Sequence, residues 1–374
     1  MNIYRAQAST QGRCMTFMLT ALLATAGRAA MASEQQMPPD ALALAKLDGY
    51  ALGMADAGQF AGVVLIAHDG RILSEKAYGL HDETTEDANT TSTRFNLASA
   101  GKMFTAVAVM QQIAQGRLSL DTKVGAVLKD YPNKAFADGV SVRQLLTHTA
   151  GAGDIELFGV ENAANRERVK TVADMVALHG ARPPAFTPGL EQVYGNFGHV
   201  VLGRMVEVLS GEDFETYVNR HIFTPAGMRH TAFVDCSARS ADLAVGYVSV
   251  DGKRQVNCAT LPVRGFPPGG QVSTAADMLR FVQALKAGKL LPPALFAEAI
   301  KTQREFMGLG FFATGYGPGW PAREFRWGHG GNADGICTDV RTYPTTGETY
   351  IVLSNRDAPG CFAVANFLHK QMKP

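Results

Sequence analysis

Segments typical of β-strands lie near both ends of the chain, and the residues between them have a mostly helical pattern. Near the start, residues 62–68 and 71–79 form two strand-like runs joined by Asp69-Gly70, a dipeptide typical of a tight hairpin turn. Four more segments alternate or run apolar near the end, at residues 309–314, 324–328, 335–343 and 348–353. We therefore expect an α+β fold, in which one antiparallel sheet is built from both chain ends and flanked by helices, with a helical region inserted between the two ends.

Apolar residues at helical spacing predict the remaining elements. Helices are expected over residues 42–57, 142–151, 200–209, 213–223, 274–288 and 361–372. A small hairpin is expected around Asp251-Gly252, and the polar residues 81–93 are expected to form a loop. The predicted domain covers residues 33–374, with a sheet part at about 33–98 and 305–374 and a helical part at about 99–304.

The first 32 residues have the pattern of a secretory signal peptide. Arg5 and Arg13 precede an apolar run over residues 15–26, and Ala30-Met31-Ala32 provides a small-residue cleavage site. The apolar run is too short to span a bilayer, so a retained anchor is the less favoured alternative. We therefore expect a cleaved leader over residues 1–32, no membrane span after cleavage, and a periplasmic or secreted protein.

The charge balance does not favour binding to nucleic acid or to an anionic membrane. The chain has 35 Lys and Arg residues against 34 Asp and Glu residues, and the leader removes basic residues but no acidic ones. The remaining chain is therefore slightly acidic, whereas proteins that bind phosphate-rich partners carry basic patches or an excess of positive charge.

Export changes how the cysteines are interpreted. Cys14 lies in the expected leader, which leaves Cys236, Cys258, Cys337 and Cys361, an even number in an oxidising compartment. Three pairings are possible, and we expect the one between sequence neighbours, Cys236 with Cys258 and Cys337 with Cys361. Buried free thiols are the alternative. The spacings lack C-x-x-C, so no metal site is predicted.

Ser99 and Lys102 stand three residues apart where a long apolar segment begins. Residues 103–113 are apolar at helical spacing, and the run stops at Gln115-Gly116. We expect a buried helix with Ser99 in its first turn and Lys102 on the same face one turn later. Burying a charged lysine costs free energy, so a buried lysine suggests a function. Its positive charge would favour an alkoxide on the serine. The S-x-x-K spacing thus predicts a nucleophile, the alternative being a solvated lysine beside an ordinary serine.

A serine acyl-transfer site also needs a base. The G-x-S-x-G motif of α/β-hydrolases is absent, and the Y-x-N triplet, which often accompanies a Ser/Lys pair, occurs at Tyr131, Tyr194 and Tyr217. Tyr217 falls within an expected helix and Tyr131 in an expected turn, so both are interpreted as structural. Tyr194-Gly195-Asn196 lies in an expected loop, from which a scaffold can aim a phenol and an amide into a cleft. Tyr194 is therefore the predicted base.

The third candidate segment is His329-Gly330-Gly331-Asn332, which follows an aromatic strand. Glycines allow close backbone approach, and bare N–H groups beside a cation-capable side chain suit carboxylate binding and oxyanion stabilisation. A histidine in a turn between strands is the alternative. His148 could be mistaken for a general base, but its place at a helix end favours a structural role in holding the following loop.

Together, Ser99-x-x-Lys102, Tyr194-x-Asn196 and His329-Gly330-Gly331 resemble, in order and spacing, the three motifs of the penicillin-recognising serine hydrolases. These include class C β-lactamases, D,D-peptidases and β-lactamase-like esterases. Connecting stretches are also similar, at residues 145–151, 225–228, 269–270, 273–275 and 353–357. The resemblance extends from about residue 62 to the C-terminal helix. It implies a β-lactamase/transpeptidase-like fold with the active site in a groove between the sheet and the helical domain.

The resemblance also implies a role for each motif residue. Ser99 would be acylated, Lys102 would activate it, and Tyr194 would act as general base and acid. Asn196 would hydrogen-bond Lys102 and the substrate. The backbone N–H groups of Ser99 and Asn332 would form the oxyanion hole, and water would then hydrolyse the acyl-enzyme. No metal or cofactor is implied.

Two positions depart from the class C β-lactamases. His329 stands where those enzymes usually carry the lysine of Lys-Thr-Gly, and Gly195 stands where a serine is frequent. A histidine is at most partly charged near neutral pH and should hold a substrate carboxylate less firmly than a lysine does. We therefore expect an exported serine hydrolase that cleaves an ester or amide of a small-molecule or peptide acyl substrate. The alternatives are a β-lactamase or D,D-carboxypeptidase and, in another class, a catalytically weak cell-envelope binding protein.

Overall fold

The computed structural model describes residues 41–153, 168–315 and 324–372, and every structural statement below concerns these residues. The expected signal peptide over residues 1–32 lies outside the described residues. Within the described part of the chain, no helix is both long enough and apolar enough to cross a membrane.

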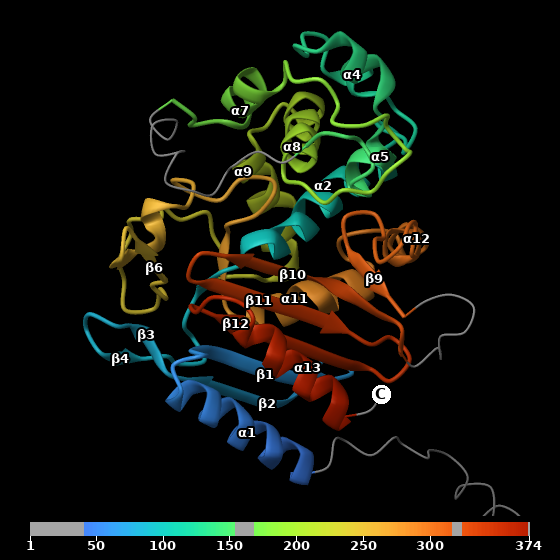
Figure 1. Cartoon of the computed structure of the whole chain (residues 1–374). Helices are drawn as coiled ribbons and strands as arrows, with labels where there is room; N and C mark the ends of the chain where they lie inside the picture. The colour runs from blue at the N-terminus through green and yellow to red at the C-terminus, as the bar shows by residue number, and fades with distance from the viewer. Residues whose placement is uncertain (1–40, 154–167, 316–323, 373–374) are drawn as a thin grey trace, which may run out of the picture. The chain divides into compact units, whose positions relative to one another are not determined.

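Six antiparallel strands form the main sheet, in the order β2-β1-β12-β11-β10-β9 (Figure 1). Their bounds are β1 Gly62–His68, β2 Arg71–Tyr78, β9 Phe312–Thr314, β10 Arg326–Ala333, β11 Ile336–Thr342 and β12 Glu348–Ser354. Strand β1 pairs with β12 along its whole length, from Gly62 opposite Ser354 to His68 opposite Glu348. The two ends of the described chain therefore share one sheet, which confirms the expected α+β fold.

Helices cover both faces of this sheet, and this is why β1 is an almost unbroken apolar run. Side chains alternate between the faces of a strand. Leu65 accordingly belongs to the core shared with the helical region, whereas Ile66 belongs to the core on the opposite face. That opposite face carries α1 (Ala41–Asp56), which contacts β2, and α13 (Gly360–Met372), which contacts β11 and β12 (Figure 1). Helix α11 (Ala275–Lys286) packs on β1 and β12 from the other side.

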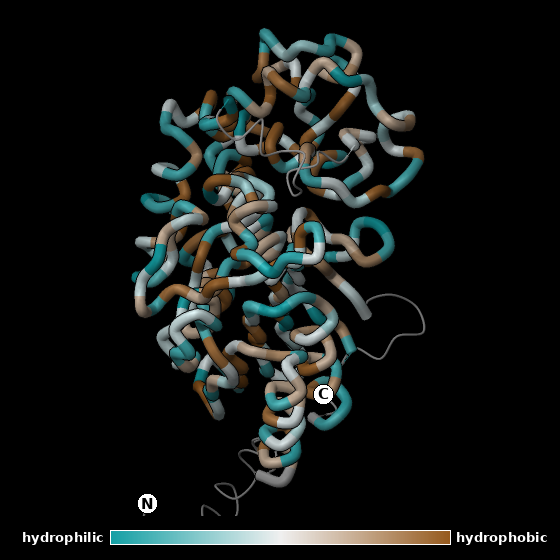
Figure 2. Tube along the Cα trace, turned by 60° about the vertical axis from the view of Figure 1, so that its left-hand side comes forward, coloured by the Kyte–Doolittle hydropathy of each residue, from teal (hydrophilic) through white to brown (hydrophobic). Residues whose placement is uncertain are grey.

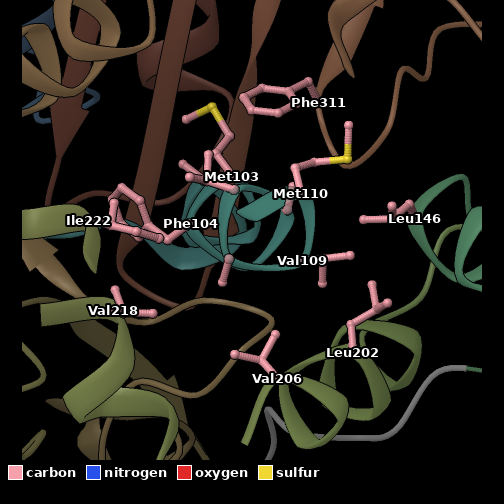
Figure 3. Packing of buried hydrophobic residues seen from close by; sticks show 14 of the residues in the cluster. Met103, Phe104, Val109, Met110, Leu146, Leu202, Val206, Val218, Ile222 and Phe311 are labelled. Atoms are coloured by element: carbon pink, nitrogen blue, oxygen red, sulfur yellow. The ribbon is translucent and has the colours of Figure 1, made fainter. Parts of the chain in front are cut away.

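Helix α2 (Lys102–Ala114) lies at the centre of the helical region and is buried on nearly every side, as its apolar sequence predicts. Figure 3 shows Met103 and Met110 on the side of Phe311, and Val109 on the side of Leu202. The other helices of this region are α3 Val124–Val127, α4 Lys134–Gly139, α5 Val142–Leu146, α7 Val172–His179, α8 Phe197–Ser210, α9 Phe214–Val218, a π-turn Asn219–Phe223, α10 Thr224–Ala226 and α12 Pro293–Ile300. Figure 2 shows hydrophobic and hydrophilic positions alternating along many segments of the chain.

Short strand pairs complete the structure. The expected hairpin forms from β6 (Tyr247–Val250) and β7 (Lys253–Val256), and its turn residues Asp251 and Gly252 have φ angles of 51° and 72°. Positive φ at both positions matches the turn that joins two-residue hairpins. The prediction of a plain loop over residues 81–93 is wrong, because this stretch contains parts of a two-stranded pair. Its strands are β3 Leu80–Asp82 and β4 Asp87–Ala88, and a second pair joins β5 Phe95–Asn96 to β8 Val272–Ser273. Such short polar strands carry no alternating apolar pattern that would have revealed them.

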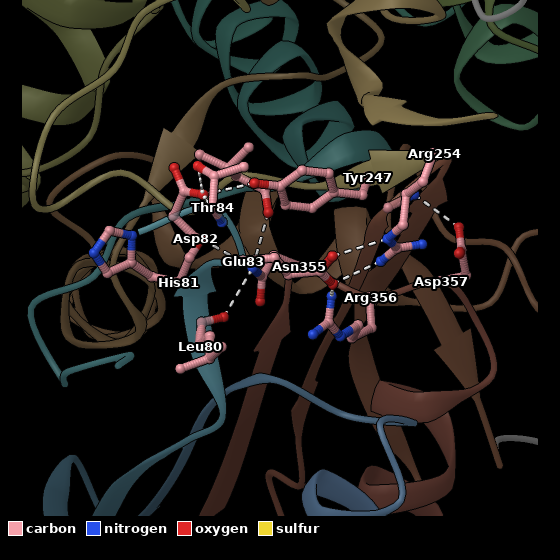
Figure 4. A network of polar contacts seen from close by, with 12 residues as sticks. Leu80, His81, Asp82, Glu83, Thr84, Tyr247, Arg254, Asn355, Arg356 and Asp357 are labelled. Atoms are coloured by element: carbon pink, nitrogen blue, oxygen red, sulfur yellow. Dashed lines mark hydrogen bonds and ion pairs between the residues drawn. The ribbon is translucent and has the colours of Figure 1, made fainter. Parts of the chain in front are cut away.

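Asn355, directly after β12, ties these short elements to the sheet (Figure 4). Its Nδ2 group lies 3.1, 3.1 and 3.0 Å from the backbone oxygens of Leu80, His81 and Val245. Because Asn355 is 3% exposed, these carbonyl oxygens receive donors where water has little access. One side chain thus joins the end of β12 to strand β3 and to the segment before β6, which are both far away in the sequence.

The described residues contain two disulfides, and each joins two cysteines that follow one another in the order of the cysteines along the chain. Cys236 pairs with Cys258 at a Cα–Cα separation of 5.1 Å, and Cys337 pairs with Cys361 at 5.6 Å. The second disulfide connects β11 to the start of α13 and therefore fastens that helix to the sheet. This is the pairing predicted from the sequence.

Candidate active site

Ser99 lies immediately before α2, in a 3₁₀ turn (η1, Ala98–Gly101) and not in the first α-helical turn as predicted. In a 3₁₀ turn, side chains three residues apart are eclipsed. The tighter turn therefore aligns Ser99 with Lys102 more closely than an α-helical turn would. Ser99 is partly exposed, whereas Lys102 is 0% exposed.

The backbone on both sides of Ser99 is held by contacts with other segments. The Ala98 N–H donates to Asn96 Oδ1 at 2.8 Å, and the Gly270 N–H donates to Ala98 O at 3.1 Å. A β-carbon on Gly269 would collide with Ala98 O, and Gly269 has a φ angle of 143°. A glycine at position 269 is therefore needed for the close approach of the two segments.

Lys102 connects the first and second motifs. Its Nζ donates to Ser99 Oγ at 3.0 Å, to Asn196 Oδ1 at 2.7 Å and to Pro268 O at 3.0 Å. A buried ammonium group is tolerated only where acceptors replace the lost water, and the oxygens around Nζ meet this requirement. Because Nζ donates to Ser99 Oγ, the hydrogen of the Ser99 hydroxyl is directed elsewhere. The structure therefore brings together three of the predicted residues by direct hydrogen bonds.

The predicted base, Tyr194, belongs to the same cluster. Lys102 Nζ lies 4.9 Å from the centre of the Tyr194 ring, and the ring is partly buried. Tyr194 lies in a loop, and Asn196 is the N-cap residue directly before α8. The other two triplet tyrosines are structural: Tyr217 lies in α9 and accepts from Gln112 Nε2, and the buried Tyr131 stacks on Phe136.

The third motif lies within a strand. The predicted strand ended at residue 328, but β10 extends to Ala333, so Gly330, Gly331 and Asn332 are paired residues of the sheet. A β-carbon on Gly331 would stand 2.9 Å from Ser99 N and 3.0 Å from Ala100 N. The strand backbone therefore lies directly against the turn that carries Ser99, and a side chain at position 331 would separate them.

The surroundings of His329 favour the uncharged form of its ring. It is 1% exposed, its ring stacks on Phe312 at a centroid distance of 3.9 Å, and its Nδ1 donates to Gly330 O. Burial, together with the positive charge of Lys102, lowers the pKa of His329 well below its ordinary value. Because Nδ1–H is the donor, the neutral ring leaves Nε2 as an acceptor. His329 therefore does not supply the positive charge that a lysine would supply at this position.

Two contributors to the site were not predicted. The first is Pro268, whose carbonyl oxygen accepts from Lys102, and the only sequence signal near it was the following pair of glycines. The second is His199, a fully buried residue of α8 whose ring stacks on His148 at 5.1 Å. Burial, together with the positive charge of Lys102, lowers the pKa of His199 well below its ordinary value. Among the described residues, no group of three or more His, Cys, Asp or Glu side chains could hold a metal ion.

Comparison with known proteins points to one family. The family model described as Beta-lactamase matches residues 29–371. Penicillin-binding protein 4 of Amycolatopsis lactamdurans is 30% identical over 304 residues, which cover 76% of this chain and 77% of that protein. Esterase EstB of Burkholderia gladioli is 30% identical over 292 residues, which cover 69% of this chain and 72% of that protein. The crystal structure of a penicillin-binding protein from Bacillus halodurans matches with a TM-score of 0.73 and 26% identity, covering 86% of this chain and 98% of that one.

Proposed function

This chain belongs to the β-lactamase family of serine hydrolases, and we propose on that premise that it cleaves an ester or amide through an acyl-enzyme on Ser99. The observation that carries the proposal is the position of Lys102 Nζ, which donates to Ser99 Oγ and to Asn196 Oδ1. A serine hydroxyl is a weak nucleophile until a neighbouring group activates it, and Lys102 is buried at hydrogen-bond distance.

In the proposed acylation step, Tyr194 removes the proton of the Ser99 hydroxyl while Oγ attacks the acyl carbon. Lys102 favours this step because its positive charge stabilises negative charge on Oγ and on the phenol. The N–H groups of Ser99 and Asn332 would donate to the oxyanion of the tetrahedral intermediate. The bond to the leaving group then breaks, and Tyr194 returns the proton to that group.

Deacylation would use the same residues, with water in place of Ser99 as the nucleophile. A water molecule, deprotonated by Tyr194, would attack the acyl carbon. The bond from the acyl carbon to Ser99 Oγ would then break, and Tyr194 would return the proton to Oγ as the acid product leaves. Asn196 would hold Lys102 in place throughout, since its Oδ1 accepts from Nζ and the residue is 7% exposed.

The site favours an uncharged substrate, for which we propose an ester first. His329, at the position of a β-lactamase lysine, is held neutral, and Gly195 provides no hydroxyl in the second motif. A substrate carboxylate would therefore find less compensation here than in a site with a lysine. A β-lactamase or D,D-carboxypeptidase activity is the second candidate, supported by the 30% identity to a penicillin-binding protein.

We further propose that residues 1–32 are a cleaved signal peptide and that the protein acts in the periplasm or outside the cell. The two disulfides support this, because disulfides persist mainly in oxidising compartments. N-terminal sequencing of the protein recovered from the expressing cells tests this proposal directly. An N-terminus after Ala32 is expected, and an intact Met1 on exported or cytoplasmic protein would contradict it.

Labelling with a serine-reactive phosphonate tests the acyl-enzyme proposal. We expect stoichiometric labelling of the wild-type protein, none of Ser99→Ala, and wild-type labelling of Ser92→Ala, an exposed serine used as the matched control. A cell-envelope binding protein without catalysis would show neither labelling nor turnover. Steady turnover of short-chain aryl esters without turnover of a chromogenic cephalosporin is expected. Cephalosporin hydrolysis or release of D-alanine from a peptide would instead support the second candidate.

A further inference from the structure

His148 packs directly against the side chain of the proposed base. The rings of His148 and Tyr194 are stacked, with centroids 4.3 Å apart and planes inclined by 29°. His148 also stacks on His199 at 5.1 Å, and it is only 6% exposed. The imidazole is therefore a fixed surface against which the Tyr194 ring rests.

A hydrogen bond joins His148 to the residue that follows Tyr194. The Gly195 N–H donates to His148 Nδ1 at 3.3 Å. Because Nδ1 is the acceptor, the neutral imidazole carries its proton on Nε2. Neither nitrogen then has a lone pair available to take a proton from substrate or from Ser99. His148 consequently does not act as a general base in this arrangement.

The rest of the loop that carries Tyr194 is held by the same short segment of chain. Backbone oxygens of residues 147–151 accept hydrogen bonds from residues 185–193. The four bonds are Gln192 Nε2 to Thr147 O at 3.1 Å, Val193 N to His148 O at 3.0 Å, Gly189 N to Thr149 O at 2.7 Å and Ala185 N to Gly151 O at 2.7 Å. Residues 185–195 contain no helix or strand, so these bonds replace the hydrogen bonding that regular structure would supply.

The backbone of His148 is itself in an unfavourable conformation. Its φ angle is +56°, in the left-handed region that side-chain-bearing residues seldom adopt. Such a conformation persists only where surrounding contacts compensate, and it is common at functional sites. At this position it turns the chain sharply after α5, so that both the ring and the backbone oxygen of His148 meet the Tyr194 loop.

We propose that His148 is a positioning residue for Tyr194, which fixes the phenol for proton transfer through ring stacking and the bond from Gly195. This inference rests on the proposed role of Tyr194 in forming the acyl-enzyme. The charge state of His148 fits it, because burial and the positive charge of Lys102 lower the pKa of His148 to about 3. The ring therefore stays neutral, with Nδ1 free to accept, over the whole range in which the enzyme would work.

Two substitutions separate the two contacts. His148→Phe keeps an aromatic ring against Tyr194 but removes the acceptor, whereas His148→Asn keeps an acceptor near the Nδ1 position but removes the ring. We expect each to slow phosphonate labelling of Ser99 by about 10- to 100-fold, since small misplacements of a catalytic group have effects of this size. His221→Gln, remote from Tyr194 on the π-turn, is the matched control and should label at the wild-type rate.

The decisive measurement is a double-mutant cycle with Tyr194→Phe. If His148 acts through the phenol, then adding either His148 substitution to Tyr194→Phe should slow labelling by no more than about twofold. Equal losses in the presence and absence of the phenol, or wild-type rates for both single variants, would overturn the proposal. The pH midpoint of the labelling rate provides a second readout. The proposal predicts that this midpoint shifts in both His148 variants. An unchanged midpoint would mean that His148 only stabilises the fold. Failure of the wild-type protein to label would instead remove the proposed function.

Discussion

Gly331 and Ser99 are in contact across the junction between strand β10 and the turn before α2, and a β-carbon on Gly331 would stand 2.9 Å from Ser99 N. Through this contact, the strand that carries the third motif packs directly against the turn that carries the serine. The position of the Ser99 N–H, one of the two proposed oxyanion donors, therefore depends on the absence of a side chain at residue 331.

Gly331→Ala is expected to slow acylation of Ser99 by about 100-fold or more, because it moves an oxyanion donor away from its place. The measurement is the rate of phosphonate labelling, with the thermal unfolding midpoint recorded alongside. Gly139→Ala is the matched control, since no atom lies within 4 Å of a β-carbon at that position. Wild-type labelling by a folded Gly331→Ala protein would rule out the proposed oxyanion hole.

Lys102→Ala and Tyr194→Phe should each reduce the acylation rate on the order of 100-fold or more, since each removes a group that activates Ser99. The first loses the donor that lies 3.0 Å from Ser99 Oγ, and the second loses the phenolic oxygen. Burst kinetics with an aryl ester measure this step, and the exposed Lys129→Ala serves as the control. Near-normal burst rates in both variants would remove the two assignments.

Asn355→Ala should destabilise the protein by about 2–3 kcal/mol without changing the residues around Ser99. The substitution leaves the backbone oxygens of Leu80, His81 and Val245 without their shared donor in a buried place. Urea unfolding of the wild-type protein and the variant measures the difference, and the acylation rate at low temperature should be unchanged. An unaltered unfolding midpoint would show that water replaces the side chain at no cost.

Stability should fall as the pH is lowered below about 6.5, because the pKa values of the buried His148, His199 and His329 are all lowered in the folded protein. In the unfolded chain these histidines bind protons near their ordinary pKa of about 6.5, so acid favours the unfolded state. Each histidine contributes about 1.4 kcal/mol per pH unit below that value. Comparing urea unfolding at pH 7.5 and 5.5, His148→Asn should lose about 1.4 kcal/mol less than the wild-type protein. Equal losses in the two proteins would show that His148 is protonated in the folded state.

The order of strands and helices was largely predictable, because it rests on local patterns. The apolar run over residues 62–68 and the Asp69-Gly70 turn were enough to predict β1 and the hairpin. The apolar residues on nearly every side of α2 were enough to predict a buried helix. The extent of β10 was not predictable, since glycines give no strand signal when the reason for them is a contact with a distant turn.

The motifs predicted that Lys102 lies beside Ser99 and bonds Asn196, but other contacts of the candidate site could not be predicted. Spacing alone could not choose among three Y-x-N triplets, and Tyr194 was preferred only because a loop was expected there. The acceptor Pro268 lies 166 residues from Lys102 in the sequence, and no local pattern connects them. The neutral state of His329 likewise follows from burial against Phe312 and from the charge of Lys102, which depend on tertiary structure.

The pairing of β1 with β12 has a consequence for biosynthesis. Gly62 pairs with Ser354 in the completed sheet, so one edge of the first hairpin stays unpaired until residue 354 has left the ribosome. Contacts that span so much of a chain form slowly and expose hydrophobic surface to other molecules in the meantime. Premature termination before the final strand should therefore yield an aggregation-prone fragment and no partially active enzyme.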